Sequence, residues 1–84
     1  MNILIDRSFE RNTDKIGDKD ILIKIAEIID QVRNSSNLKS IRNLKKLQGS
    51  NNYYRIRTGD YRMGVIKIGG NTITFVRFLH RKEI

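Results

Sequence analysis

Hydrophobic residues recur along residues 19–33 in the spacing of a helix that buries one face. The stripe consists of Ile21, Leu22, Ile25, Ile28, Ile29 and Val32, and it follows the i, i+1, i+4, i+7, i+8, i+11 pattern. Asp18 stands just before it, where a helix N-cap is expected. A shorter helix is predicted over residues 8–16, because Phe9, Thr13 and Ile16 would share one face.

The remaining apolar segments predict strands. Ile3 to Ile5 form a short first strand, and residues 53–58, 61–68 and 72–80 are rich in β-branched or aromatic residues and bounded by turn signals. Between them, apolar residues recur every third position from Leu38 to Leu47, which suits a helical turn or a packed loop. The fold class is therefore α+β, a single domain over 1–84 with order β-α-α-β-β-β. Both helices are expected on one face of a small antiparallel sheet.

The alternation of side chains along a strand predicts two different sheet faces. One face would carry the core residues Tyr54, Ile56, Tyr61, Met63, Val65, Val76 and Phe78. The opposite face would carry the arginines Arg55, Arg57, Arg62, Arg77 and Arg81. Tyr53 shares the arginine side, whereas Tyr54 and Tyr61 are expected to pack in the core.

The charge of the chain is concentrated in its second half. Residues 1–37 hold six Lys/Arg against seven Asp/Glu, whereas residues 38–84 hold eleven against two, within a formal net charge of +8. Such a field attracts polyanions. The arginine pattern therefore indicates a surface for nucleic-acid phosphates. A solvated outer sheet face is the alternative, but such faces usually mix charges of both signs.

Composition excludes several other classes of protein. With no cysteine and one histidine, no disulfide or zinc site is expected, and neither a metal nor another cofactor is predicted. The first residues are too soon interrupted by charge for a signal peptide, and no apolar run approaches ~18 residues. The expected location is the cytoplasm, with no membrane partner.

Four short motifs in the second half resemble the RelE/ParE superfamily of toxins from toxin–antitoxin systems. They are Asn43-Leu44-Lys45-Lys46-Leu47-Gln48-Gly49, Tyr54-Arg55-Ile56-Arg57, Gly59-Asp60-Tyr61-Arg62 and His80-Arg81-Lys82-Glu83-Ile84. Their order and spacing carry the resemblance, which is weaker over residues 1–37. RelE-like members cleave mRNA in the ribosomal A site, whereas ParE-like members poison DNA gyrase.

The resemblance implies a role for each matching residue. Arg55, Arg57, Arg62 and Arg81 fall on the family's catalytic basic positions, where they would bind the phosphate and stabilise the transition state. His80 matches a histidine common in RelE-like sequences and favours the nuclease branch. It is the best candidate for the catalytic acid or base, because histidine titrates near neutrality unaided; a histidine at a strand end that bonds a backbone carbonyl is the alternative.

Other side chains of the second half are candidates for RNA contacts. These are Lys45, Lys46, Tyr53 and Arg77. Since strict alternation would place His80 opposite Arg81, we expect the last strand to end or twist at residue 79 or 80.

Two departures from the family pattern bear on the chemistry. The first alternating pair is usually lysine, and arginine does not readily transfer protons. The family also continues past Ile84 with a tyrosine that contributes to cleavage. The sequence thus predicts a ribosome-dependent, metal-free mRNA endonuclease, paired with an acidic antitoxin in a hetero-oligomeric complex. A gyrase inhibitor and a catalytically weak module that binds nucleic acid or antitoxin remain as alternatives.

Overall fold

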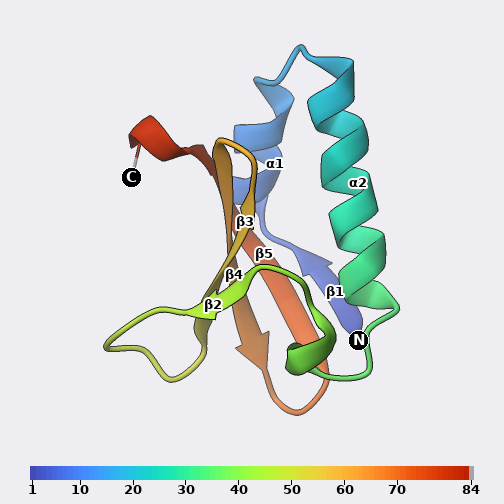
Figure 1. Ribbon diagram of the computed structural model, residues 1–84, viewed down its shortest axis with the longest axis vertical. Helices are drawn as coiled ribbons and strands as arrows, with labels where there is room; N and C mark the ends of the chain where they lie inside the picture. The colour runs from blue at the N-terminus through green and yellow to red at the C-terminus, as the bar shows by residue number, and fades with distance from the viewer. Residues whose placement is uncertain (84) are drawn as a thin grey trace.

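One five-stranded sheet with both helices on a single face makes up the fold (Figure 1). The computed structural model describes residues 1–83, so Ile84, the last residue of the C-terminal motif, lies outside the described residues. The elements are β1 (Asn2–Ile5), α1 (Arg7–Asp14), α2 (Lys19–Arg33), the 3₁₀ helix η1 (Leu38–Ser40), β2 (Leu44–Lys46), β3 (Tyr53–Thr58), β4 (Tyr61–Ile68), β5 (Thr72–His80) and the 3₁₀ helix η2 (Arg81–Glu83).

The strand order is β1-β5-β4-β3-β2. Strands β2 to β5 pair antiparallel, as expected from the short turns between β3, β4 and β5. Strand β1 pairs parallel to β5, which makes the sheet mixed. The α+β class and the helices on one face are confirmed, with one strand more than the sequence predicted.

Helix α2 has the bounds that its apolar stripe predicts. The Asp18 carboxylate accepts hydrogen bonds from the backbone N–H groups of Asp20 and Ile21, which confirms the N-cap. Ile25, Ile28 and Val32 of the stripe are buried. Helix α1 starts slightly before the predicted residue 8, because the Asp6 side chain caps it by accepting from the Ser8 N–H.

A β-bulge in β5 makes the core differ from the predicted one, because Phe75 rather than Val76 is buried. Gly64 pairs with Arg77 and Val65 pairs with Phe75, so Val76 is the extra residue between them. Before the bulge, Phe75 points into the core, and after it Phe78 does. Val76 was expected in the core, but it lies at the bulge and is only half-buried. Because the bulge reverses the alternation, Arg77 lies on the face opposite the helices.

Side chains of α1 form hydrogen bonds with backbone groups of β5 at the bulge and just after it. The Ser8 hydroxyl donates to the Val76 carbonyl, and the Asn12 side-chain oxygen accepts from the Phe78 N–H at 3.0 Å. Phe9 of the same helix packs edge-on against the rings of Phe75 and Phe78, with centroids 5.4 and 6.1 Å apart. The helix therefore fixes the bulge through hydrogen bonds and through packing.

The segment between α2 and β3 differs from its predicted form. A helical turn is present at η1, but Leu44–Lys46 is strand β2 rather than a helical turn or a packed loop. Asn43, whose φ is 62°, directs the chain into this strand. The pairing sets Lys45 opposite Arg55 and Lys46 opposite Tyr54 at this edge of the sheet.

None of the helices within residues 1–83 is long and apolar enough to cross a membrane.

Candidate nucleic-acid interface

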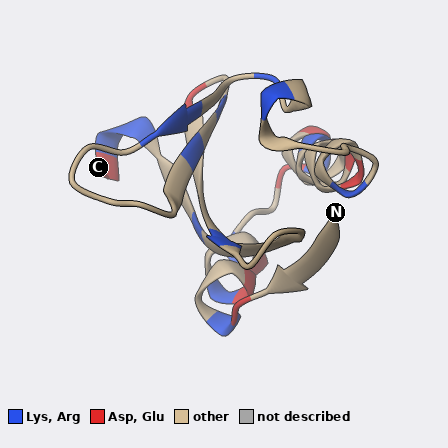
Figure 2. Cartoon of the chain, turned by 90° about the horizontal axis from the view of Figure 1, so that it is seen from below, with Lys and Arg blue, Asp and Glu red and all other residues tan. Residues whose placement is uncertain are grey.

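The sheet surface opposite the helices is the candidate interface, and we call it the arginine face. Its basic residues on the strands are Lys45, Arg55, Arg57, Arg62 and Arg77. Strands β3, β4 and β5 carry no Asp or Glu, all of their residues being described. Figure 2 shows both signs of charge along α2, whereas the strands near the C-terminus carry mainly basic positions. The charge asymmetry of the sequence thus becomes an asymmetry between the two layers.

The strand register brings these cations close together. Arg57 lies directly opposite Arg62 on the neighbouring strand, and in the adjacent row Arg55 and Arg77 flank Gly64. Lys45 continues that row from β2. Like charges directly opposite each other are unfavourable in a sheet, and here no carboxylate within the strands relieves the repulsion. An anion with several negative oxygens would bind such an arrangement favourably.

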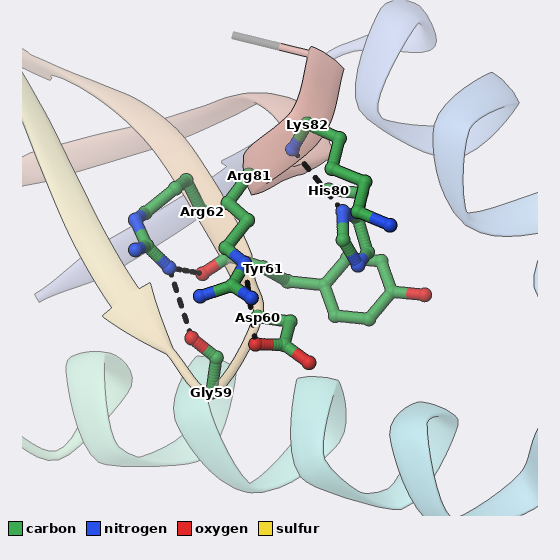
Figure 3. A network of polar contacts seen from close by, with 7 residues as sticks. All are labelled: Gly59, Asp60, Tyr61, Arg62, His80, Arg81 and Lys82. Carbon is green, nitrogen blue, oxygen red and sulfur yellow. Dashed lines mark hydrogen bonds and ion pairs between the residues drawn. The ribbon is translucent and has the colours of Figure 1, made fainter.

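Arg62 lies at the centre of this field. Partial burial lowers the pKa of its guanidinium most, and the nearby charges of Arg57, Arg55 and Arg81 lower the pKa further, while Asp60 opposes the shift. The guanidinium donates hydrogen bonds to the carbonyl oxygens of Gly59 and Tyr61, both at 2.9 Å (Figure 3). The tight turn between β3 and β4 therefore holds Arg62 beside the other three arginines.

Arg81 joins the cluster because the same turn holds the end of β5. The Arg81 N–H donates to the Asp60 carbonyl at 2.7 Å. The Arg81 side-chain Nε lies 3.6 Å from an Asp60 carboxylate oxygen, and both side chains are more than half exposed. An exposed pair of this kind adds little stability. Asp60 thus contacts Arg81 through both its backbone and its side chain, a contact the sequence did not reveal.

His80 contacts different neighbours from the arginines. It is paired with Tyr61, and the two rings meet edge to face with centroids 5.2 Å apart. The Tyr61 ring in turn stacks on Phe78 at 4.7 Å on the core side. Figure 3 shows Arg62 and Arg81 on one side of β4 and the rings of Tyr61 and His80 on the other. Strand β5 does end at His80, as expected, and Arg81 begins η2.

The hydrogen bonds of His80 fix which ring nitrogen carries the proton. The Lys82 backbone N–H donates to His80 Nδ1 at 3.1 Å. Since Nδ1 accepts, the neutral ring carries its proton on Nε2. The His80 backbone N–H is held by the Glu83 carboxylate at 3.1 Å. In this arrangement the neutral ring presents an N–H at Nε2 that can donate a hydrogen bond, whereas its Nδ1 lone pair is already engaged.

The remaining candidates divide between the two sides of the sheet. Lys45 is level with Arg55 on the arginine face, whereas Lys46 is level with Tyr54, whose side chain packs against the core on the helix side. Both lysines are exposed. Tyr53 lies on the arginine face, as the alternation of side chains along β3 predicts. The structure thus gathers Tyr53, Lys45 and Arg77 with the arginines and leaves Lys46 on the opposite side.

A family model and a known protein both match nearly the whole chain. The family model described as the ParE toxin of the type II toxin-antitoxin system, parDE, matches residues 3–84. Toxin RelE3 of Methanocaldococcus jannaschii is 40% identical over 85 residues, which cover 100% of this chain and 94% of that protein.

Two solved structures are also similar to this chain. A chain of a RelB-RelE antitoxin-toxin complex from Methanococcus jannaschii matches with a TM-score of 0.81 and 38% identity, over 95% of this chain and 92% of that chain. A chain of the RelBE2 toxin-antitoxin complex from Mycobacterium tuberculosis matches with a TM-score of 0.73 and 21% identity, over 95% and 96% of the two chains. At that identity the second match supports the fold alone.

Proposed function

The chain belongs to the ParE toxin family of type II toxin–antitoxin systems, and from this premise we propose that it cleaves messenger RNA in the ribosomal A site. The observation that carries the proposal is the arginine face. Arg55, Arg57 and Arg62 converge with Arg81 at one end of the sheet, where partial burial and then the charges of the other three arginines lower the pKa of Arg62. A phosphodiester in the strained geometry of cleavage is the anion that such a cluster stabilises best.

The reaction is an internal transfer at phosphorus. The 2′-hydroxyl oxygen of one nucleotide forms a bond to the adjacent phosphorus, and the bond from phosphorus to the 5′-oxygen of the next nucleotide breaks. Water takes the proton of the 2′-hydroxyl, and the leaving 5′-oxygen receives a proton. The guanidinium groups stabilise the negative charge that grows on the phosphoryl oxygens. Removing one such donor typically lowers the rate on the order of 10²- to 10³-fold.

His80 is the proton donor in this proposal. The ring is neutral while Nδ1 accepts from the Lys82 N–H, so it donates only after Nδ1 takes up a proton and that hydrogen bond breaks; the imidazolium then gives its Nε2 proton to the leaving 5′-oxygen and returns to the neutral form. Its ring lies on the Tyr61 side of the sheet, so in this proposal the RNA passes over the end of β5, with the scissile phosphate at Arg81 and the leaving oxygen toward His80. General acid catalysis of this kind contributes typically 10²- to 10⁴-fold.

Dependence on the ribosome follows from the scarcity of proton carriers. Arginine remains protonated at physiological pH and cannot act as a base, and the chain has one histidine. Holding the 2′-hydroxyl in line with the phosphate must therefore supply much of the acceleration, and the ribosome provides that geometry. Naked RNA should be cleaved poorly.

The proposed partner is a cognate antitoxin with an acidic segment. Residues 38–84 hold eleven Lys/Arg against two Asp/Glu, and an acidic polypeptide on the arginine face would neutralise this charge and cover the site. The similar structure at 38% identity is an antitoxin-toxin complex. We expect a hetero-oligomer in which the antitoxin protects the cell.

Induction of the chain in cells tests the proposed activity. Translation, mRNA 5′ ends and DNA-damage signalling are followed together, with Arg62→Ala as the inactive control. New mRNA 5′ ends within codons, absent from the control, would support the nuclease. Growth arrest with DNA-damage signalling and unchanged mRNA ends would overturn it in favour of gyrase inhibition, the activity implied by the ParE name of the matched family.

A further inference from the structure

A small pocket lies on the arginine face beside the proposed catalytic cluster. Its volume is about 210 Å³. Apolar groups from Leu47, Tyr53 and Leu79 line it, together with the backbone of Gly64 and three guanidinium-bearing side chains, Arg55, Arg62 and Arg77. Pockets for drug-sized ligands usually measure about 300 Å³ or more. This one therefore suits a single planar ring system rather than a whole nucleotide.

Gly64 creates the space in which the Tyr53 ring lies. A Cβ atom at position 64 would come within 2.4 Å of the Tyr53 hydroxyl oxygen and 3.2 Å of the Arg77 Cβ. Any side chain here would push the tyrosine off the sheet. A glycine inside a strand often marks close approach of another group, and here that group is an aromatic ring half-exposed at the edge of the pocket.

We infer that this pocket binds one nucleobase of the RNA whose phosphates lie along the arginine face. The Tyr53 ring offers a stacking surface, the two leucines exclude water, and arginine planes stack on bases while their charges hold the flanking phosphates. An apolar pocket with a cationic rim matches a nucleotide, which is itself apolar on its base faces and anionic on its backbone. The inference rests on the proposed function only in that the ligand is RNA.

The pocket also accounts for the position of Arg77. The bulge at Val76 turns Arg77 toward Gly64 rather than toward the core, and α1 stabilises that bulge through Ser8 and Asn12. The bulge thus places this cation beside the pocket, one row of side chains away from Arg62 on the arginine face. Arg77 would contact the phosphate next to the bound base.

Binding of matched oligonucleotides tests the inference without any cleavage. The probes are a short 2′-O-methyl RNA, which has no reactive 2′-hydroxyl, and an abasic analogue with the same backbone and the same number of phosphates. The purified full chain should bind the base-containing probe roughly 5- to 100-fold more tightly than the abasic probe, as stacking of one base predicts. Both affinities should fall with salt, because both probes contact the arginines.

Four variants test whether the preference for the base-containing probe comes from the pocket. Tyr53→Ala should bring the affinity ratio of the two probes close to one, whereas Tyr53→Phe keeps the ring and should keep the ratio. Gly64→Ala displaces the ring and should also lower the ratio. Leu22→Ala removes a half-exposed leucine from α2 and should leave the ratio unchanged. Thermal unfolding of each variant shows whether it folds, and the Tyr53 pair suffices if Gly64→Ala does not.

The outcomes separate this inference from the proposed function. Equal, salt-dependent binding of both probes would overturn the inference that the pocket binds a nucleobase. The pocket would then be free for another occupant, such as a side chain of a protein partner. A preference that survives Tyr53→Ala would also overturn it. If neither probe binds, the RNA-binding premise itself fails.

Discussion

Replacing Arg62 with alanine removes the central cation of the arginine face while leaving the core untouched. Arg62 alternates with the buried Met63 and points away from the helices. Its guanidinium donates only to turn carbonyls, those of Gly59 and Tyr61, which water can reach in its absence. The repulsion from Arg55, Arg57 and Arg81 also disappears. The midpoint of thermal unfolding should therefore change by less than about 4 °C.

Two magnitudes separate the roles of Arg62 in binding and in chemistry. For single-stranded RNA, each neutralised phosphate contributes about −0.7 to the slope of log K against log salt concentration, so the four arginines give a slope no steeper than about −3, the value reached if each neutralises a separate phosphate. Arg62→Ala should make the slope shallower by at most about 0.7. Its rate of mRNA cleavage on the ribosome should fall on the order of 10²- to 10³-fold, far more than the loss of one phosphate contact.

Arg62→Lys provides the matched control for charge. Lysine keeps the positive charge but lacks the planar fork of donors. It should preserve the salt slope while recovering only part of the lost rate. The assays are fluorescence anisotropy with the non-cleavable RNA at several salt concentrations and single-turnover cleavage of ribosome-bound mRNA. Full cleavage by Arg62→Ala, or an unfolded Arg62→Ala protein, would refute the placement of the site on this sheet face.

Three further predictions concern stability and positioning. Phe75→Ala should lower the free energy of unfolding by about 3–5 kcal/mol, whereas Val76→Ala should cost about 1 kcal/mol or less; equal losses in denaturant titrations would argue against the bulge. Asp6→Ala should lower the thermal midpoint at neutral pH. Because hydrogen bonds from Ser8 depress the pKa of Asp6 below 3.8, this difference should shrink as pH falls below that value and persist above it; a pH-independent difference would contradict the capping role. Asp60→Asn should slow cleavage without changing the thermal midpoint by more than a few degrees, because Arg81 loses its ionic partner; unchanged single-turnover rates would show that Arg81 needs no such partner.

The regular elements could be predicted from the sequence because each had a strong local signal. The stripe over residues 19–33 matches α2 end to end, and Asp18 caps it. The three strands after residue 52 match β3, β4 and β5, because turn residues separate them at short intervals. Alternation within β3 and β4 then predicted the arginine face correctly.

The bulge could not be derived from alternation. The sequence of β5 has apolar residues at both odd and even positions, with Phe75 next to Val76. Alternation alone therefore does not say where the side chains change from one sheet face to the other. Helix α1 stabilises the bulge at this position, because Ser8 and Asn12 form hydrogen bonds with the backbone of β5 there. That information lies more than sixty residues away in the chain.

Strand β2 and the pocket were missed for different reasons. Leu44–Lys46 is only three residues long, and its spacing from Leu38 and Leu47 imitates a helical turn. The pocket depends on contacts between strands that the sequence does not show. Its one local signal was Gly64, an isolated glycine within a strand. The roles of the arginines and of His80 in cleavage stay predictions.

Cleavage of mRNA on purified ribosomes with an empty A site tests the central claim most directly. The full chain is added in excess to ribosomes carrying end-labelled mRNA, and to the same mRNA alone, with Arg62→Ala as the control. We predict rapid cleavage within the A-site codon, slow or undetectable cleavage of free mRNA, and a product that carries a 5′-hydroxyl. Intact mRNA on the ribosome after prolonged incubation with the folded parent chain would contradict the account.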